Sequence, residues 1–264
     1  MKQLEDLLSI MAKLRDPKDG CPWDKKQTFK SILPYTLEEA YEVADAIDRG
    51  DMEELESELG DLLFQVVFYA QIAKEEDAFD FSDIVRGICK KMLRRHPHVF
   101  ADDQIDSAEE QTRAWEQHKE AERRQKSASS ANTGILADVP ITLPGLTRAA
   151  KLQKRAASVG FDWPDLTGVM DKIREELDEV QELIDSGADH AAFEDEIGDL
   201  LFATVNLARF AKVNPESAIR STNSKFVGRF GFVEQQLQRQ GVNLDDASLD
   251  EMDLLWEQAK SKSS

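Results

Sequence analysis

The chain has 264 residues and a formal net charge of −19, with 41% hydrophobic and 32% charged residues. This length suggests one or two domains with cores of their own, and the hydrophobic content excludes disorder along the whole chain. The acidic balance excludes a broad DNA- or RNA-binding face, because such a surface repels the phosphate backbone. Single nucleotides are not excluded, provided that a divalent metal and a few local cations offset their charge.

Cysteine and hydropathy patterns narrow the class further. Cys21 and Cys89 are too few for a disulfide framework or a thiolate zinc site. Residues 1–9 alternate charged and apolar residues and lack the core of a signal peptide. The most apolar run, 62–73, is short and interrupted by two glutamines, so we expect no membrane span. The sequence predicts a cytoplasmic protein.

Hydrophobic periodicity predicts helices and no strands. Apolar residues recur at helical spacing over 37–47 and again over 55–66. Helix-forming residues are plentiful, whereas glycine, proline and β-branched clusters are sparse. We therefore expect the fold to be all-α, with a helical bundle in each half of the chain.

A pair of acidic motifs stands on either side of Gly50. Glu39 and Glu42 precede this glycine, and Glu58 and Asp61 follow it. Glu39 and Asp61 are equally far from the glycine along the chain, and so are Glu42 and Glu58. Residues three apart share one face of a helix. Glycine followed by Asp is typical of one helix ending and the next beginning. If the two helices are antiparallel, the four carboxylates meet at matching levels.

Residues 126–145 are predicted to be a linker, because they are rich in small residues and contain two helix-breaking prolines. The linker separates an N-terminal domain, residues 1–125, from a C-terminal domain, residues 146–264. The two halves also share motifs in the same order, which indicates an internal duplication. The matched segments are AKL at 12–14 and 150–152, GCPWD and GFDW, EEAYEV and EELDEV, LGDLLF and IGDLLF, and WEQ at 115–117 and 256–258.

The second half repeats the acidic pattern about Gly187. Glu176 and Glu179 precede this glycine at the same separations as in the first half. Asp199 and Glu196 follow it, each displaced further along the chain by a single residue. This mismatch corresponds to about 1.5 Å of helix rise. The antiparallel geometry predicted for the first half is therefore expected here too.

Four facing carboxylates repel one another unless a cation neutralises them. Oxygen ligands without His or Cys select a hard cation, so we expect Mg²⁺, with Mn²⁺ as a substitute. The alternative is that the acids are ordinary surface residues, with Thr36 and Glu39 forming a helix capping box. Gly60 and Gly198 each lie between the two acids of the second helix, and we expect them to permit close packing of the ligand helices.

Basic residues are candidate contacts for a phosphate chain, and Trp163 and Trp256 are candidates for stacking on a base. Lys225 and Arg229 lie four apart on a predicted helix, and Lys172 lies one turn before Glu176. Lys91 and Arg95 repeat the first spacing in the N-terminal half. Solvated lysines and arginines are the simpler interpretation of any one pair.

The E-E-x-x-E motif, at 38–42 and 175–179, is followed by E-x-x-D at 58–61 and 196–199, and this order resembles the all-α nucleoside triphosphate pyrophosphohydrolases. The longer motifs GCPWD, LEEAYEV, ELGDLLFQVVFYAQ, RRHPHVF, VGFDW, EIGDLLFATVNLAR and KFVGRF resemble the MazG family over nearly the whole chain. The resemblance implies two tandem MazG-like helical bundles. It also implies Mg²⁺-dependent hydrolysis of nucleoside triphosphates to monophosphate and pyrophosphate, by a homodimer or larger assembly.

Site residues follow from the resemblance, position by position. The implied metal ligands of the second half are Glu176, Glu179, Glu196 and Asp199. Those of the first half are Glu39, Glu42, Glu58 and Asp61. Glu175 would orient or deprotonate the attacking water. The implied nucleotide contacts are Lys172, Lys225, Arg229 and Trp256. The first half departs from this pattern at the positions that correspond to the region of Lys172 and to Asn223, where it has Cys89. The second half is therefore expected to be the main active site.

Two other functions fit parts of the pattern. A di-iron carboxylate bundle would need E-x-x-H motifs, and no His lies near either acidic cluster. A non-catalytic acidic scaffold or regulatory protein that binds basic partners would need only solvated glutamates. Mg²⁺ would barely change the melting temperature of such a scaffold.

Overall fold

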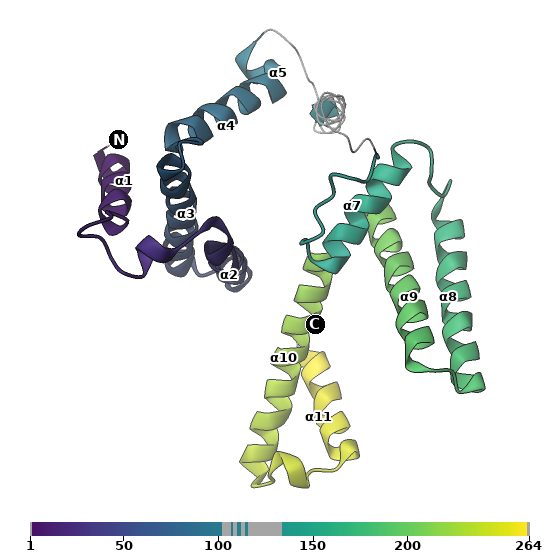
Figure 1. Cartoon of the computed structure of the whole chain (residues 1–264). Coiled ribbons are helices and arrows are strands. Elements are labelled where there is room, and N and C mark those ends of the chain that lie inside the picture. Colours follow the sequence, from purple (N-terminus) through teal and green to yellow (C-terminus); the bar gives the residue numbers. More distant parts are fainter. Residues whose placement is uncertain (1, 102–106, 108–109, 112–113, 116–133, 263–264) are drawn as a thin grey trace. The chain divides into compact units, whose positions relative to one another are not determined.

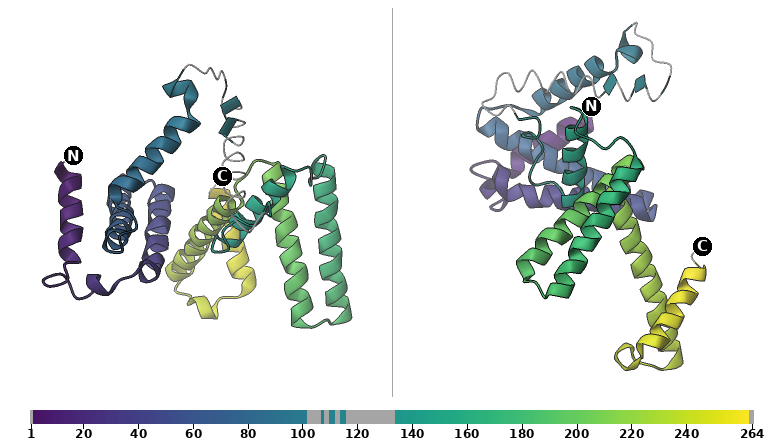
Figure 2. Two further views of the ribbon diagram at one scale, coloured as in Figure 1. Left: turned by 45° about the horizontal axis from the view of Figure 1, so that its top comes forward. Right: turned by 90° about the vertical axis from the view of Figure 1, so that its right-hand side faces the viewer.

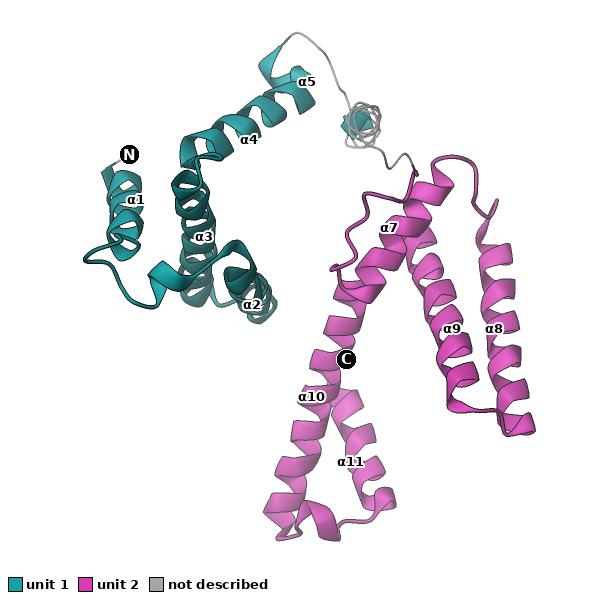
Figure 3. Cartoon of the chain, in the orientation of Figure 1, with its two compact units in different colours: residues 1–124 teal, residues 125–264 magenta. Residues whose placement is uncertain are grey.

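The computed structural model describes residues 2–101, 107, 110–111, 114–115 and 134–262. Residues 126–133 of the predicted linker, and the repeated positions 116 and 117, lie outside the described residues. Contacts divide the chain into two compact units, residues 1–124 and 125–264 (Figure 3). None of the described residues lies in a β-strand, which confirms the predicted all-α fold.

Unit 1 is built on a helical hairpin with a further helix against one side (Figure 1). Its helices are α1 (Lys2–Leu14), α2 (Phe29–Arg49), α3 (Met52–Glu75), α4 (Phe81–Arg95) and the short α5 (Pro97–Phe100). α2 pairs with α3, and α1 packs on α3. Buried Met11, Ile32 and Phe68 form the centre of the core, one from each of these helices.

Unit 2 repeats the hairpin and adds a second helix pair. Its helices are α7 (Gly145–Ala157), α8 (Leu166–Ser186), α9 (His190–Phe210), α10 (Pro215–Gln240) and α11 (Leu249–Lys262). α8 and α9 lie side by side in every view, with their connecting turn at one end (Figures 1 and 2). α7 packs on α9, and α11 packs on α10 through Val233, Leu237 and Leu255.

The loop between α1 and α2 is held by a buried arginine. Arg15 donates hydrogen bonds to both carboxylate oxygens of Glu75 and to the backbone carbonyls of Asp24 and Gln27. The guanidinium also lies 5.4 Å from the Phe68 ring centroid. Because the Arg15 side chain is only 6% exposed, these contacts fasten the loop to the end of α3.

Unit 2 places Gln153 where unit 1 has Arg15, directly after the shared AKL motif. Its amide donates to the Phe202 carbonyl at 2.8 Å. The ion pair that holds the loop of this unit is instead formed by Arg209 on α9 and Asp162 in the loop before α8. The two units therefore fix equivalent loops with different residues.

No described helix combines the length and apolarity needed to cross a membrane.

Candidate metal centres

The turn of the first hairpin confirms the predicted pivot. α2 ends at Arg49, and Gly50 adopts a left-handed conformation with φ 69°. Asp51 then begins α3, because its carboxylate accepts a hydrogen bond from the backbone N–H of Glu54. Glycine supplies the left-handed angle at little cost, and Asp satisfies a free N–H group of the new helix. The chain thus reverses at Gly50 and Asp51 and brings the acids of α2 opposite those of α3.

The second hairpin uses the same devices with one more residue. Gly187 ends α8 with φ 66°, and the Asp189 carboxylate accepts from the Ala192 N–H at the start of α9. Ala188 is the added residue between them. The antiparallel pairing of the ligand helices is therefore present in both units.

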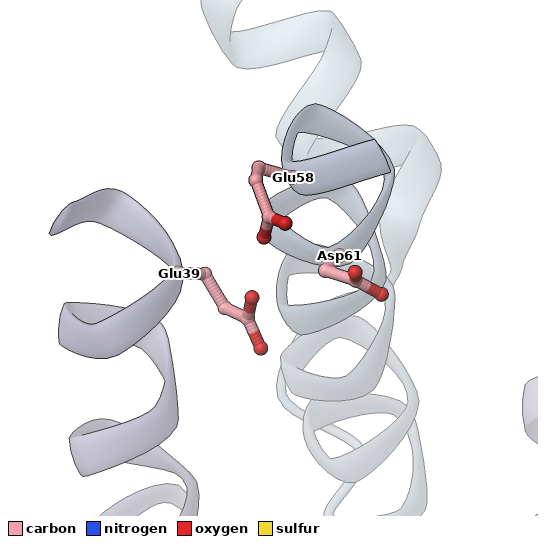
Figure 4. Close-up of side chains that lie close together, drawn as sticks. All are labelled: Glu39, Glu58 and Asp61. Carbon is pink, nitrogen blue, oxygen red and sulfur yellow. The ribbon is translucent and has the colours of Figure 1, made fainter. Parts of the chain in front are cut away.

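Each hairpin gathers three carboxylates. Ligand oxygens of Glu39, Glu58 and Asp61 all lie within 4.8 Å of one another in unit 1. Figure 4 shows Glu39 reaching from one helix toward the two acids of the other. The matching group in unit 2 satisfies the same distance limit and consists of Glu176, Glu196 and Asp199. These clusters could bind a metal, because oxygen-only sites suit hard divalent cations.

The fourth predicted acid of each set, Glu42 or Glu179, lies outside these groups of three but close enough to interact with them. Burial and then the negative charge of Glu196 raise the pKa of Glu179. Burial and then the charge of Glu42 raise the pKa of Glu58. Both fourth acids therefore belong to the electrostatic environment of the clusters.

The pKa of Glu39 is also raised, first by burial and then by the charge of Asp61. A raised carboxyl pKa means that the folded protein disfavours the charged form. Positive charge among these groups would lower the pKa of Glu39 again, because it stabilises the charged carboxylate.

Glu176 is the most enclosed acid of the two clusters. The residue is 3% exposed, and its Oε2 atom is buried without a hydrogen-bond partner among the described residues. Its other oxygen, Oε1, lies 2.8 Å from the Lys172 Nζ. A buried carboxylate oxygen without a partner is costly, so its presence indicates a position where a ligand completes the site.

Lys172 also contacts Glu175, with Nζ donating to Oε1 at 2.7 Å. These hydrogen bonds, with Glu175 as the larger cause and Glu176 next, raise the pKa of Lys172. The ammonium group therefore stays charged and binds two acids at once. The structure thus places three predicted site residues of unit 2 in direct contact.

Unit 1 lacks this lysine and uses a different partner. Tyr35 occupies the position one turn before Glu38 that Lys172 occupies before Glu175. Gln65 on α3 is 7% exposed and donates to the Glu39 Oε1 at 3.2 Å. Gln65 was not among the predicted site residues, although its place one turn after Asp61 on an apolar helix was a usable signal. The equivalent residue of unit 2 is alanine.

The predicted nucleotide contacts on α10 and α11 form a separate group. The Arg229 guanidinium lies 5.9 Å from the Trp256 ring centroid, and Phe226 packs on the same tryptophan at 5.2 Å. Unit 1 repeats the pairing between Arg95 and Trp115, at 4.7 Å. Within the described part of unit 2, no hydrogen bond or ion pair joins Lys225, Arg229 or Trp256 to the carboxylates of α8 and α9.

One alternative interpretation of the sequence, a capping box at Thr36, and one expectation, close helix packing at Gly60 and Gly198, are wrong. Thr36 does not cap a helix, because α2 begins at Phe29 with Thr28 as its cap. The Thr36 hydroxyl instead lies 2.8 Å from the Tyr69 hydroxyl in mid-helix. Gly60 and Gly198 do not permit close packing within the described chain, since a Cβ atom at either position would meet no neighbouring atom within 4 Å.

Comparison with known proteins gives a consistent result. The family model described as the MazG nucleotide pyrophosphohydrolase domain matches the chain over residues 27–100 and 166–231. One match falls in each unit and includes its carboxylate cluster, which confirms the predicted tandem duplication.

Curated relatives are similar over nearly the whole chain. A protein of Escherichia coli named nucleoside triphosphate pyrophosphohydrolase is 53% identical, with 98% of each chain covered. A Thermotoga maritima protein named nucleoside triphosphate pyrophosphohydrolase/pyrophosphatase MazG is 44% identical, over 97% of this chain and 95% of the relative. A solved structure of a mazG-related protein from Thermotoga maritima is 31% identical, covers 44% of this chain and 98% of its own, and has a TM-score of 0.38.

Proposed function

The chain belongs to the MazG nucleotide pyrophosphohydrolase family, and from this premise we propose that it hydrolyses nucleoside triphosphates to nucleoside monophosphate and pyrophosphate with Mg²⁺. Membership of an enzyme family sets aside the alternative of a non-catalytic scaffold. The observation that carries the proposal is the buried Glu176, whose unpartnered oxygen belongs to a cluster with Glu196 and Asp199.

The proposed reaction is an attack by water on the α-phosphorus. A bond forms between the water oxygen and this phosphorus, the bond to the oxygen bridging the α- and β-phosphates breaks, and pyrophosphate leaves. Glu175 is 57% exposed at its side chain and lies beside the cluster, so we assign it the role of orienting the water and accepting its proton. Mn²⁺ would substitute for Mg²⁺ among the same oxygen ligands.

The bound Mg²⁺ would be held by Glu176, Glu179, Glu196 and Asp199. When bound, it supplies positive charge to the phosphates and makes a nearby water more acidic. The chain's own cations complete the charge balance. Lys172 lies at the cluster, and Lys225 and Arg229 would stabilise the leaving pyrophosphate.

Trp256 is proposed to contact the base of the nucleotide. Its ring already packs against Phe226 and lies near the Arg229 guanidinium, so the aromatic surface stands next to a cation suited to phosphate. This arrangement supports a nucleotide-binding surface on α10 and α11. The bound substrate would connect this surface to the carboxylates of α8 and α9.

We propose that unit 2, within the domain 146–264, carries the main activity, and that the domain 1–125 holds a second metal site. Lys172 is absent from the first copy, and Tyr35 stands in its place. We also propose a homodimer or larger assembly. Both hairpins leave large apolar side chains exposed, which a partner subunit would cover; these are Leu37, Tyr41, Leu59, Leu63, Leu177, Ile197, Leu201 and Phe202.

A pyrophosphate assay tests the function directly. The purified chain is incubated with a panel of nucleoside triphosphates, with Mg²⁺ or with a chelator, and the released pyrophosphate and orthophosphate are measured separately. We expect pyrophosphate and monophosphate in equal amounts, and only with the metal. Release of orthophosphate with nucleoside diphosphate would contradict attack at the α-phosphorus.

A further inference from the structure

The ammonium group of Lys172 contacts the carboxylate cluster of unit 2 through Glu176. Its Nζ is 2.7 Å from the Glu175 Oε1 and 2.8 Å from the Glu176 Oε1. The lysine side chain is 37% exposed, whereas that of Glu176 is 4% exposed. The lysine therefore reaches inward from the surface and neutralises the most enclosed acid of the site.

This neutralisation is incomplete. Glu176 Oε2 is buried and has no hydrogen-bond partner among the described residues. Within the same part of the chain, Glu176 forms an ion pair with Lys172 alone. Glu196 and Asp199 add two more acids within 4.8 Å. One positive charge thus faces several carboxylates, and a divalent ion would balance the site better than the lysine does.

The first unit shows that the fold does not require this lysine. Glu39, which corresponds to Glu176, receives a neutral amide hydrogen bond from Gln65, and Tyr35 replaces the lysine. The hairpin still gathers its three acids there. The lysine contact in unit 2 is therefore an addition to the ligand geometry rather than a condition for it.

We propose that Lys172 is a built-in substitute for the cation in the metal-free site of unit 2, and that entry of a divalent ion releases it. The inference rests on the proposed function. Release would free the ammonium group for the phosphates and would free Glu175 from its ion pair. A long, flexible lysine side chain is suited to such an exchange, because it can reach either position by rotation.

The order of binding follows from this exchange. A nucleotide that arrives before the metal meets four acids and a lysine that is already paired. After the metal binds, the same nucleotide meets a neutralised cluster and a free ammonium group. The divalent ion should therefore bind first, and nucleotide binding without it should be weak.

The first test measures the reactivity of Lys172 toward an amine-acylating reagent in the full-length wild-type chain, by mass spectrometry. Lys172 labelling should rise severalfold when Mg²⁺ is added without nucleotide. Lys260 is the matched control, because it pairs with Glu257 at the same spacing and its side chain has a similar exposure of 45%. Its labelling should not change with Mg²⁺. Unchanged labelling of Lys172 would overturn the proposal.

The second test measures Mn²⁺ affinity in the full chain with the first cluster disabled by Asp61→Asn. Lys172→Met should bind Mn²⁺ severalfold more tightly, because it removes the competing ammonium group. Arg174→Met removes the same charge from the same helix, where Arg174 pairs with Asp171 on the exposed side, and should leave the affinity nearly unchanged. Weaker Mn²⁺ binding by Lys172→Met would mean that the lysine supports the ligand geometry, which contradicts the exchange.

The same experiment separates this inference from the proposed function. If the Asp61→Asn chain binds no Mn²⁺, the metal site of unit 2 is wrong and the proposed function fails with it. If it binds Mn²⁺ and Lys172 responds in neither test, the metal site stands and the lysine exchange is wrong.

Discussion

The two hairpins hold the same acids but balance their charge differently. In unit 1 a neutral amide, Gln65, donates to Glu39. In unit 2 an ammonium group, Lys172, pairs with Glu176, and the residue equivalent to Gln65 is alanine. An amide contact leaves the total charge of the cluster unchanged, whereas a lysine supplies a charge that can move to a substrate.

Duplicated ligands therefore do not imply duplicated chemistry. Both clusters could bind a metal, but among the described residues a lysine forms an ion pair with a cluster acid in unit 2 alone. A metal held in unit 1 would face no lysine able to contact phosphate at that position. Variants of either unit can therefore show how far the two have diverged.

Asp199→Ala should have the largest effect, because it removes a proposed ligand from the more complete site. We expect the rate of pyrophosphate release to fall by about 100-fold or more, a loss of roughly 3 kcal/mol in transition-state stabilisation. The measurement is kcat/KM for a nucleoside triphosphate. The matched variant Asp61→Ala should keep activity within about threefold, a difference of under about 1 kcal/mol. Equal losses in the two variants would mean that both units catalyse.

Mg²⁺ should stabilise each unit through its own cluster. An ion present at about 100 times its dissociation constant adds roughly 2.7 kcal/mol to the unfolding free energy of the unit that binds it. Scanning calorimetry of the wild type, Asp61→Asn and Asp199→Asn should show that each variant loses only part of the response. If Asp61→Asn responds as the wild type does, the first cluster holds no metal.

Arg15→Met should destabilise unit 1 more than Gln153→Met destabilises unit 2. The arginine variant loses an ion pair with Glu75 and hydrogen bonds to two backbone carbonyls, at a cost of about 2 kcal/mol. The glutamine variant loses one neutral hydrogen bond to Phe202, worth about 1 kcal/mol. Chemical denaturation followed by circular dichroism measures both. The reverse order would mean that the arginine contacts do not hold the loop.

The pH dependence of the metal-free protein should show the smallest effect. The pKa values of Glu39, Glu58 and Glu179 are raised above the ordinary value of 4.5, so the folded state holds these protons longer than the unfolded state. This contribution to stability is present below pH 4.5 and is lost as the pH rises through the raised values. Thermal midpoints measured in chelator should therefore fall over that window relative to Glu58→Gln, which carries one acid fewer.

An excess of Mg²⁺ should reduce this fall, because the ion binds the deprotonated carboxylates. Identical pH profiles for the wild type and Glu58→Gln would show that the acids do not interact strongly enough to affect folding.

Local signals in the sequence predicted the ligand hairpins well. Glycine at the end of one helix and Asp at the start of the next act over a short stretch of chain, so Gly50 and Gly187 could be identified as pivots without tertiary information. The spacing of the acids about each pivot predicted two sets of four carboxylates, and the structure brings three of each set within 4.8 Å of one another.

Contacts between distant segments could not be predicted in the same way. Spacing places Gln65 on the face of Asp61, but only the packing of α2 on α3 shows that it meets Glu39. Periodicity likewise defines an apolar face without showing what covers it. Leu37 and Tyr41 belong to such a face and are 48% and 54% exposed in the chain by itself.

The short turns at Gly50 and Gly187 also bear on how the protein folds. The outermost acids of each cluster, Glu39 and Asp61 or Glu176 and Asp199, are separated along the chain only by the end of one helix, the turn and the start of the next. Contacts between residues this close in sequence form quickly, because little chain entropy is lost in closing the loop. During synthesis, each cluster can therefore assemble as soon as its own hairpin has left the ribosome, and the ion can stabilise that hairpin before the remaining helices of its unit have been made.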